Sequence, residues 1–383
     1  MRFIHTADWH LGKLFYGHHL LSLQRKALAH FIQECKSFCP DFILLAGDIY
    51  DKSIPSCEAM QLLEDTLYQL VGCLNIPLIM ISGNHDSARR LGFAAKLLEK
   101  QGLYIVSSWR KDPIVIKTKS RDVSIYPLPY LDPREVEGLF SEPCHDNYQE
   151  ALSMCLKQWN LTSDPNWKVF LGHLFVRGGC SSDSEAILSI GGVEQVSAKC
   201  FGAFDYVALG HLHRPQHLKP DPIFYPGSLL KYSFSEAKHT KLFYRVEISN
   251  EGKLFVKESI IPIIVDVCVL KGSFEKITSE YSGKICNDYM KIILDDGPVT
   301  LYKRQILLQL FPNLVYLSSS LVSAVGKAQL DQEIKENFIQ DTQNLKGLFG
   351  SFFIQQAGRT LTQDELAIIE DHFAQVAILS RKE

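Results

Sequence analysis

The sequence predicts a mixed α/β fold: two β-sheets pack face to face as a sandwich flanked by helices, followed by a small α+β module and a pair of helices. Short apolar runs rich in β-branched residues recur through the first 213 residues, as strands buried in a sheet do. Stretches with helical apolar spacing separate the early runs, and further short extended pieces follow. With 383 residues, 46% of them hydrophobic, the chain can bury a sizeable core in more than one domain.

Strands and helices alternate at the start of the chain. Extended runs are predicted at 3–7, 42–46 and 78–81, with helical apolar spacing at 20–38 and 57–74 between them. This order is typical of parallel βαβ units. Ligands of open α/β sheets bind beyond the carboxyl ends of the strands, so we expect the residues after these runs to meet in one crevice.

Later extended pieces indicate a second sheet. They lie at 114–117, 123–126, 242–248 and 254–261, and the last two flank a glycine-containing turn. An antiparallel sheet that faces the first is the economical interpretation. Both sheets together would place residues 1–262 in one domain, close to the usual upper size for a single core.

A smaller module is predicted over residues 263–338. It carries no chemical motif, which favours a role in shaping or covering the substrate site over a catalytic one. Its predicted elements are, in order, a strand at 265–270, a helix at 274–281, a strand at 289–294, a helix at 301–310 and a strand at 315–320.

The last segment, 339–383, predicts two amphipathic helices. Apolar residues from Leu345 to Phe353 recur at helical spacing, and Gly358 is placed to end that helix. Thr362 and Glu365 then form a capping box that opens the second helix. These helices either pack on their own domain or dock on another protein, as an amphipathic helix does in a groove.

Composition limits the compartment and the partners. The formal net charge of −3 neither supports nor excludes a polyanionic partner, so contacts with nucleic acid would need local basic groups or metal ions. Ten cysteines without a CxxC pair, and no hydrophobic signal region, fit a reduced cytoplasmic compartment. The longest apolar candidate, 260–270, is interrupted by Pro262 and Asp266, so no membrane association is expected.

Five of the apolar runs end in side chains that bind metals. Taken singly, each ending has a plain explanation, such as a turn or a partly buried histidine; together they favour a metal site. In a strand, residues i and i+2 point to the same side, so paired ligands separated by one residue are expected to face one cavity. The endings are Asp8 with His10, Asp48, Asn84, His173, and His211 with His213.

Seven candidate ligands are too many for one ion. Carboxylate, amide and imidazole groups without thiolate suit Mn²⁺, Fe or Zn²⁺ better than Mg²⁺. Two ions about 3.5–4 Å apart need a bridging oxygen, for which Asp48 is the natural choice, and such a pair would activate water for phosphoester hydrolysis. We assign Asp8, His10, Asp48 and His213 to one ion, and Asp48, Asn84, His173 and His211 to the other.

Two further residues are candidates for catalysis. His85 directly follows Asn84 and should face another way, so we predict that it protonates the leaving oxygen. Alternatively, Asp86 simply holds it in a turn. Asp51 is expected to accept a hydrogen bond from the His85 ring and so fix its tautomer. Its alternative role is to cap the following helix.

The motifs carry a family resemblance. The blocks 8–10, 47–51, 83–86, 172–173 and 210–213 resemble the five signature blocks of the calcineurin-like metallophosphoesterases. Further stretches at 5–12, 182–185, 204–216 and 225–236 resemble the family of bacterial SbcD nuclease subunits, and the similarity covers nearly the whole chain. A departure from the wider family is Asp51, where archaeal and eukaryotic relatives tend to carry histidine.

This resemblance implies a manganese-dependent DNA nuclease for repair, recombination and replication. It implies ATP-dependent exonuclease action on double-stranded ends and endonuclease action on single strands and hairpins. Residues 263–338 would be a capping domain that presents DNA, and 339–383 would bind the coiled-coil base of SbcC, an ATPase of the ABC type. Two nuclease subunits are expected to form a homodimer within a heterotetramer.

DNA contacts and competing functions stay open at this point. A stand-alone phosphoesterase for a cyclic nucleotide, phosphoprotein or lipid phosphate would need neither the extra module nor the tail. A non-catalytic scaffold would be expected to lack ligands, yet all seven are present. The candidates for DNA contact, for which a solvated position on the surface is the plain alternative, are Lys13, Arg89, Arg90, Arg214, Ser228 and Lys231.

Overall fold

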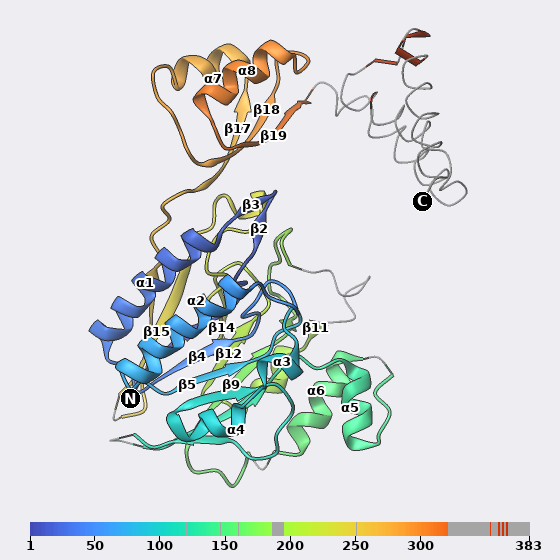
Figure 1. Ribbon diagram of the computed structural model, residues 1–383. Helices are drawn as coiled ribbons and strands as arrows, with labels where there is room; N and C mark the ends of the chain where they lie inside the picture. Colours follow the sequence, from blue (N-terminus) through green and yellow to red (C-terminus); the bar gives the residue numbers. More distant parts are fainter. Residues whose placement is uncertain are drawn as a thin grey trace, which may run out of the picture. The chain divides into compact units, whose positions relative to one another are not determined.

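The computed structural model describes residues 1–118, 121–145, 147–159, 161–185, 195–249 and 251–320, together with isolated positions between 353 and 366. It divides the chain into two compact units, Met1–Ile264 and Val265–Glu383. Figure 1 shows the mixed α/β architecture, with several sheets and flanking helices, so the predicted fold class is confirmed. No helix in the described part of the chain has both the length and the apolar character needed to cross a bilayer.

The first six-stranded sheet contains three of the five motif-bearing strands. Its strands, in spatial order, are β16 (Leu254–Ile260), β15 (Leu242–Ile248), β1 (Arg2–Thr6), β4 (Phe42–Ala46), β5 (Leu78–Ile81) and β6 (Leu103–Val106). The strands from β1 to β6 run parallel, whereas β15 lies antiparallel to β1. We predicted β15 and β16 in the second sheet, which is wrong. These strands instead cover the edge of β1, which would otherwise expose unpaired backbone groups.

The second six-stranded sheet holds the other two motif-bearing strands. Its order is β13 (Gln216–Leu218), β14 (Ile223–Tyr225), β12 (Tyr206–Gly210), β9 (Trp167–His173), β8 (Val123–Leu128) and β7 (Ile114–Ile116). Only the edge strands β13 and β7 pair antiparallel. The predicted antiparallel sheet is therefore wrong. Helices α5 (Pro133–Phe140) and α6 (Tyr148–Lys157) lie between β8 and β9 and provide the crossover that a parallel pair requires.

The two sheets share a core between their facing surfaces. Phe3, Leu44 and Ile79 of the first sheet belong to the same buried cluster as Val169 and Tyr206 of the second, and all five side chains are fully buried. Helices α1 (Leu21–Phe38) and α2 (Cys57–Leu67) cover the first sheet (Figure 1). The predicted helix over 57–74 continues beyond α2 as a π-helix, Tyr68–Cys73. Packing between layers fixes where the strands end, and so positions the site.

Residues 265–320 of the second unit, which the structure describes, form a small parallel βαβαβ module. Each helix begins at a hydroxyl cap, Ser273 for the first and Thr300 for the second. Both hydrogen bonds of the predicted capping box at Thr362 and Glu365 are present, but the rest of the predicted helix pair lies outside the described residues. The module's elements are β17 (Val267–Gly272), α7 (Phe274–Glu280), β18 (Tyr289–Leu294), α8 (Leu301–Leu310) and β19 (Leu314–Ser319).

Candidate metal centre

The seven predicted ligands converge where the strands of both sheets end. They follow β1, β4 and β5 of the first sheet and end or follow β9 and β12 of the second. Six of the seven are buried and Asn84 is half-buried. The single crevice expected from one open sheet is therefore built by two sheets together, because the parallel strands of both end on the same side of the sandwich.

The paired ligands lie beyond their strands rather than within them. Strand β1 ends at Thr6 and β12 ends at Gly210, so the predicted i, i+2 alternation does not orient these side chains. Left-handed backbone at non-glycine residues is strained and is often concentrated at functional sites. Positive φ angles occur at Asp8 (51°), His10 (45°), Asp48 (49°) and His211 (96°).

Backbone hydrogen bonds stabilise these turns. The amide of Asp8 donates to the carbonyl of Gly47 at 3.1 Å, and the amide of His10 donates to the carbonyl of Asp48 at 2.9 Å. The amide of His211 donates to the Asp8 carboxylate at 3.0 Å. Loops from three strand ends therefore hold one another in place.

One group of ligands contains Asp8, His10 and His213, whose ligand atoms all lie within 4.8 Å of one another. The Nε2 atoms of His10 and His213 are 3.0 Å apart. One of these nitrogens can donate a hydrogen bond to the other, and a bound cation would replace that hydrogen and take both nitrogens as ligands.

The second group contains Asp8, Asp48 and His173 within the same 4.8 Å limit. The Oδ1 atom of Asn84 lies 3.0 Å from Nε2 of His173 and 3.2 Å from Nδ1 of His211. This set combines carboxylate, amide and imidazole donors without a thiolate, which suits a borderline divalent ion such as Mn²⁺ or Zn²⁺.

Asp48 lies between the two groups. Its Oδ2 atom is 3.5 Å from Nε2 of His10 and 3.4 Å from Nε2 of His173. Its other oxygen, Oδ1, accepts a hydrogen bond from the amide of His85 at 2.9 Å. One carboxylate oxygen thus faces both groups while the other is held by the backbone, an arrangement that fits a bridging ligand.

Hydrogen bonds behind the ligands fix their tautomers. His173 donates from Nδ1 to the carbonyl of Ala46 at 2.9 Å, which turns its Nε2 atom toward the centre. Behind His213, the hydroxyl of Ser184 donates to Glu236 at 2.5 Å and therefore accepts the Nδ1 hydrogen of His213, 2.6 Å away.

A buried ion pair anchors this chain of hydrogen bonds. Glu236 pairs with the ammonium group of Lys241, and both side chains are fully buried. The ammonium also donates to the carbonyl of His213 at 2.8 Å. Sequence reasoning assigned no role to Ser184, Glu236 or Lys241, although the first two lie in stretches that carried the family resemblance.

Replacing Ser184 with alanine is expected to weaken metal binding by about 10- to 100-fold, as losses of such outer hydrogen bonds typically do. The variant removes the acceptor that fixes the His213 tautomer and leaves the Glu236 carboxylate one donor short. Titration calorimetry with Mn²⁺ measures the change. Ser37→Ala, which also removes one hydroxyl hydrogen bond but on the exposed end of α1, is the matched control. Equal affinities for both variants would contradict the role of Ser184.

Burial and charge set the protonation states. Burial raises the pKa of the Asp8 carboxyl to about 7, against the lowering effect of His173. Burial also acts to raise the pKa of Asp48, but His173 and His10 outweigh it and hold that pKa well below its ordinary range. Burial lowers the pKa of His10, and it lowers the pKa of His211 to about 3. For His173, burial is overcome by the Asp48 carboxylate, which raises the pKa to about 9.

These protonation states suit a set of ligands for a divalent cation. Neutral His10 and His211 present lone pairs, whereas His173 carries a proton that a bound cation would have to displace. The buried carboxylates Asp8 and Asp48 supply the negative charge that a divalent cation would neutralise.

His85 stands next to the two groups. Its ring lies 4.8 Å from that of His10, centroid to centroid, and its Nδ1 atom donates to the main-chain carbonyl of Asp51 at 2.9 Å. The predicted hydrogen bond from the His85 ring to Asp51 is therefore present, although the main-chain carbonyl of Asp51 accepts it and the carboxylate does not. That carboxylate is instead paired with the ammonium group of Lys13 at 2.6 Å. The tautomer of His85 is still fixed, but by backbone.

The alternative role of His85 is compatible with the structure, because the Asp86 carboxylate accepts a hydrogen bond from the amide of Gly83 and so closes the turn that contains His85. The same carboxylate also accepts hydrogen bonds from the amides of Ile49 and Tyr50. The alternative role of Asp51 is wrong. Helix α2 begins at Cys57 with Ser56 as its cap, so Asp51 does not cap it.

Two glycines allow the strand ends to approach closely. A Cβ on Gly83 would lie 2.1 Å from Oδ1 of Asp48, and one on Gly210 would lie 1.8 Å from the carbonyl oxygen of Ala46. Neither distance is sterically possible. Gly83 is thus required by the close approach of neighbouring strand ends within the first sheet, and Gly210 by the packing of β12 of the second sheet against β4 of the first.

The six candidates for DNA contact divide into two groups. Arg89, Arg90 and Arg214 are exposed. The other three are held in internal contacts: Lys13 pairs with Asp51, Lys231 is buried and donates to the carbonyl of Ala237 at 2.6 Å, and Ser228 is buried and donates to the carbonyl of Leu230 at 2.8 Å.

The chain is similar in sequence to proteins of known class. Residues 1–215 match the model of the calcineurin-like phosphoesterase family. The chain is 39% identical to the SbcD component of the nuclease SbcCD from Staphylococcus epidermidis over 354 residues, which cover 89% of this chain and 93% of that protein. It is 38% identical to the same component from Staphylococcus saprophyticus, over 83% of this chain and 85% of that protein.

Proposed function

Because the chain belongs to the calcineurin-like phosphoesterases and, within them, to the SbcD nuclease subunits, we propose that its metal centre hydrolyses phosphodiester bonds of DNA. The chain is a metal-dependent hydrolase and the nuclease subunit of an SbcCD-type complex. The observation that best supports the proposed centre is the position of Asp48, whose Oδ2 atom faces both groups of ligands.

Divalent ions, when bound, supply Lewis acidity that activates water and neutralises charge on the phosphodiester. We propose that Asp8, His10, Asp48 and His213 hold one ion and that Asp48, Asn84, His173 and His211 hold the other. Manganese is the proposed metal: the mixed oxygen and imidazole donors without thiolate suit Mn²⁺, Fe or Zn²⁺, and the resemblance to the SbcD nuclease subunits implies Mn²⁺.

His85 is the proposed general acid. Its Nδ1 hydrogen stays on the carbonyl of Asp51, so Nε2 is the atom that delivers a proton to the leaving oxygen. Asp51 acts on this step through its backbone, while its carboxylate, paired with Lys13, lies 3.7 Å from Nδ1 of His10.

The name of the relatives implies an SbcC partner. We propose that residues 339–383 bind the coiled-coil base of this ATPase, that 263–338 present DNA as a capping domain, and that two nuclease subunits form a homodimer within a heterotetramer. Exposed Arg89, Arg90 and Arg214 are the proposed phosphate contacts.

Digestion of a duplex with blocked ends tests this function. The full chain and its SbcC partner are copurified, and cleavage with Mn²⁺ is measured with and without ATP. We expect the two proteins to copurify, ATP to stimulate cleavage and a chelator to abolish it. Deleting 342–383 should remove the ATPase from the complex and leave Mn²⁺-dependent cleavage of single strands. Hydrolysis of cyclic nucleotides but of no form of DNA would contradict the proposal and favour a stand-alone phosphoesterase.

A further inference from the structure

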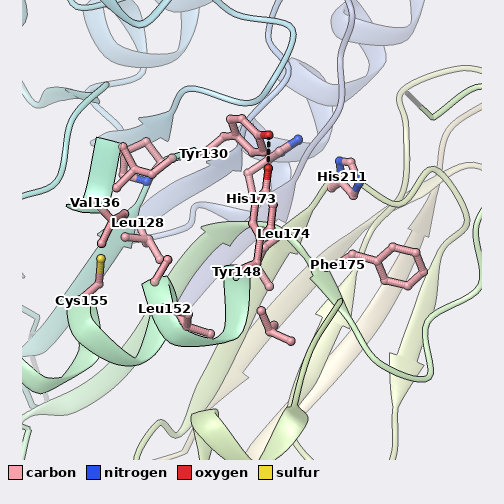
Figure 2. Close-up of a pocket in the computed structure, with 14 residues that line it drawn as sticks. Leu128, Tyr130, Val136, Tyr148, Leu152, Cys155, His173, Leu174, Phe175 and His211 are labelled. Atoms are coloured by element: carbon pink, nitrogen blue, oxygen red, sulfur yellow. Dashed lines mark hydrogen bonds between the residues drawn. The ribbon is translucent and has the colours of Figure 1, made fainter. Parts of the chain in front are cut away.

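An apolar pocket adjoins the metal centre (Figure 2). The free space between its walls, together with the solvent in front of them, comes to about 540 Å³. Its walls come from the loop after β8, from helices α5 and α6, and from the segment that joins β9 to the short strand β10 (Phe175–Val176). Leu128, Val136 and Leu152 form much of its inner side (Figure 2).

The pocket and the metal centre share two side chains. His173 and His211, both proposed ligands, line the pocket as well. Aromatic rings stand next to them: the centroid of Phe175 is 6.3 Å from that of His211, and the centroid of Tyr130 is 6.5 Å from that of His173. A molecule bound through the metal centre would therefore extend directly between aromatic side chains.

The lining selects against charged ligands. No Asp, Glu, Lys or Arg is among the described residues that line the pocket. Its polar feature away from the histidines is a pair of tyrosines, Tyr130 and Tyr148, whose hydroxyl groups are 2.8 Å apart (Figure 2). A neutral, flat group with apolar faces and a polar edge matches this environment, whereas a second phosphate does not.

We propose that this pocket binds the base of an unpaired nucleotide whose phosphodiester lies at the metal centre, an inference that rests on the proposed action on DNA. One sugar joins a base to its phosphate, so a base pocket must adjoin the phosphate site, as this one does. Aromatic rings stack on any base without selecting its sequence.

The proposal gives a structural reason for action on single strands and hairpin loops. A base within a duplex is stacked and paired, so moving it out of the duplex into the pocket costs free energy. For an unpaired base this cost is absent or small. The pocket would therefore favour unpaired nucleotides in the ground state. Phe175 is the residue to test because it is half-buried at the pocket and is not a proposed metal ligand.

Phe175→Ala is compared with the wild type on two substrates, each with Mn²⁺: a single-stranded oligonucleotide and an oligomer of the same length built from abasic units, whose phosphodiesters carry no flat group. We expect the variant to lose roughly tenfold in kcat/KM on the oligonucleotide, through KM, and to act like the wild type on the abasic oligomer. Phe93→Ala is the matched control, since its phenyl ring is 81% exposed and does not line the pocket.

A second comparison does not depend on any variant. The wild type is given an oligomer of the same length built from abasic units, which should show a similar loss relative to the oligonucleotide. Equal kcat/KM on oligonucleotide and abasic oligomer, or equal loss for both substrates in Phe175→Ala, would overturn the base pocket while leaving DNA hydrolysis intact. A wild type that cleaves bis(p-nitrophenyl) phosphate but no DNA would overturn the proposed function and this inference with it.

Discussion

Asp48→Ala is expected to reduce phosphodiester hydrolysis by about a thousandfold or more, equivalent to at least ~4 kcal/mol of transition-state stabilisation. Oδ2 of Asp48 faces both groups of ligands, at 3.5 Å from His10 and 3.4 Å from His173. Its loss removes the one oxygen able to serve both ions and leaves the proton of His173 without its main anionic partner. The centre should then bind fewer than two equivalents of metal.

Steady-state cleavage of an oligonucleotide with Mn²⁺, together with elemental analysis of the purified variant, measures both effects. The matched control is Asp65→Ala, which removes an aspartate from an exposed ion pair with Arg25 on the helical face. That control should keep wild-type activity and metal content. Two equivalents of tightly bound metal in Asp48→Ala would show that this carboxylate is not the bridge.

The second large effect is expected for His85→Ala, which should lower DNA cleavage by about 10²- to 10⁴-fold, the usual contribution of a positioned general acid. Metal content and DNA affinity should stay close to those of the wild type, because the His85 ring is held through Nδ1 on the backbone of Asp51 and alanine keeps the amide that donates to Asp48. Fluorescence anisotropy with labelled DNA and elemental analysis supply the two controls.

The leaving group provides a sharper test of the same role. p-Nitrophenolate departs without a proton, so His85→Ala should lose far less activity on bis(p-nitrophenyl) phosphate than on DNA. His145→Ala, at an exposed histidine of the same unit, should leave both activities unchanged. His85 also lies in a group with His10 and Asp51 whose ligand atoms are mutually within 4.8 Å. Loss of metal from His85→Ala would therefore identify it as a ligand instead of an acid.

Strand periodicity was sufficient to predict which elements form the core and where they end. The apolar runs at 42–46 and 78–81 are the strands β4 and β5, with fully buried side chains, and the motifs follow directly after them. A strand that is buried on both faces is a continuous apolar run in the sequence, and it can be recognised without knowing which strands it pairs with. Convergence of the motifs followed from that placement.

Pairing between strands was not predictable in the same way. The sequence of β15 reads equally well in either sheet, and only its register with β1, such as Phe3 opposite Val246, assigns it to the first. The predicted orientation of the Asp8 and His10 side chains was wrong for a related reason. Their left-handed backbone is set by hydrogen bonds to the loop after β4, a contact that local periodicity does not contain.

Polar contacts between residues far apart in the sequence could not be predicted either. Ser184 and Glu236 are 52 residues apart in the sequence, and each is an ordinary polar residue when taken alone. Their role depends on a hydrogen-bond chain from His213 to a buried lysine. By contrast, the capping box at Thr362 was predictable because both partners lie within one helical turn.

The close approach of Gly210 to Ala46 has a consequence for biosynthesis. Asp8, Asp48 and Asn84 leave the ribosome well before His211 and His213 do, so a growing chain carries an incomplete ligand set for much of its translation. Residue 210 must dock against the strand that ends at residue 46 before the late histidines reach the early carboxylates. Chains that end before residue 211 are therefore expected to be unable to cut DNA, and such products of aborted translation should be harmless to the chromosome.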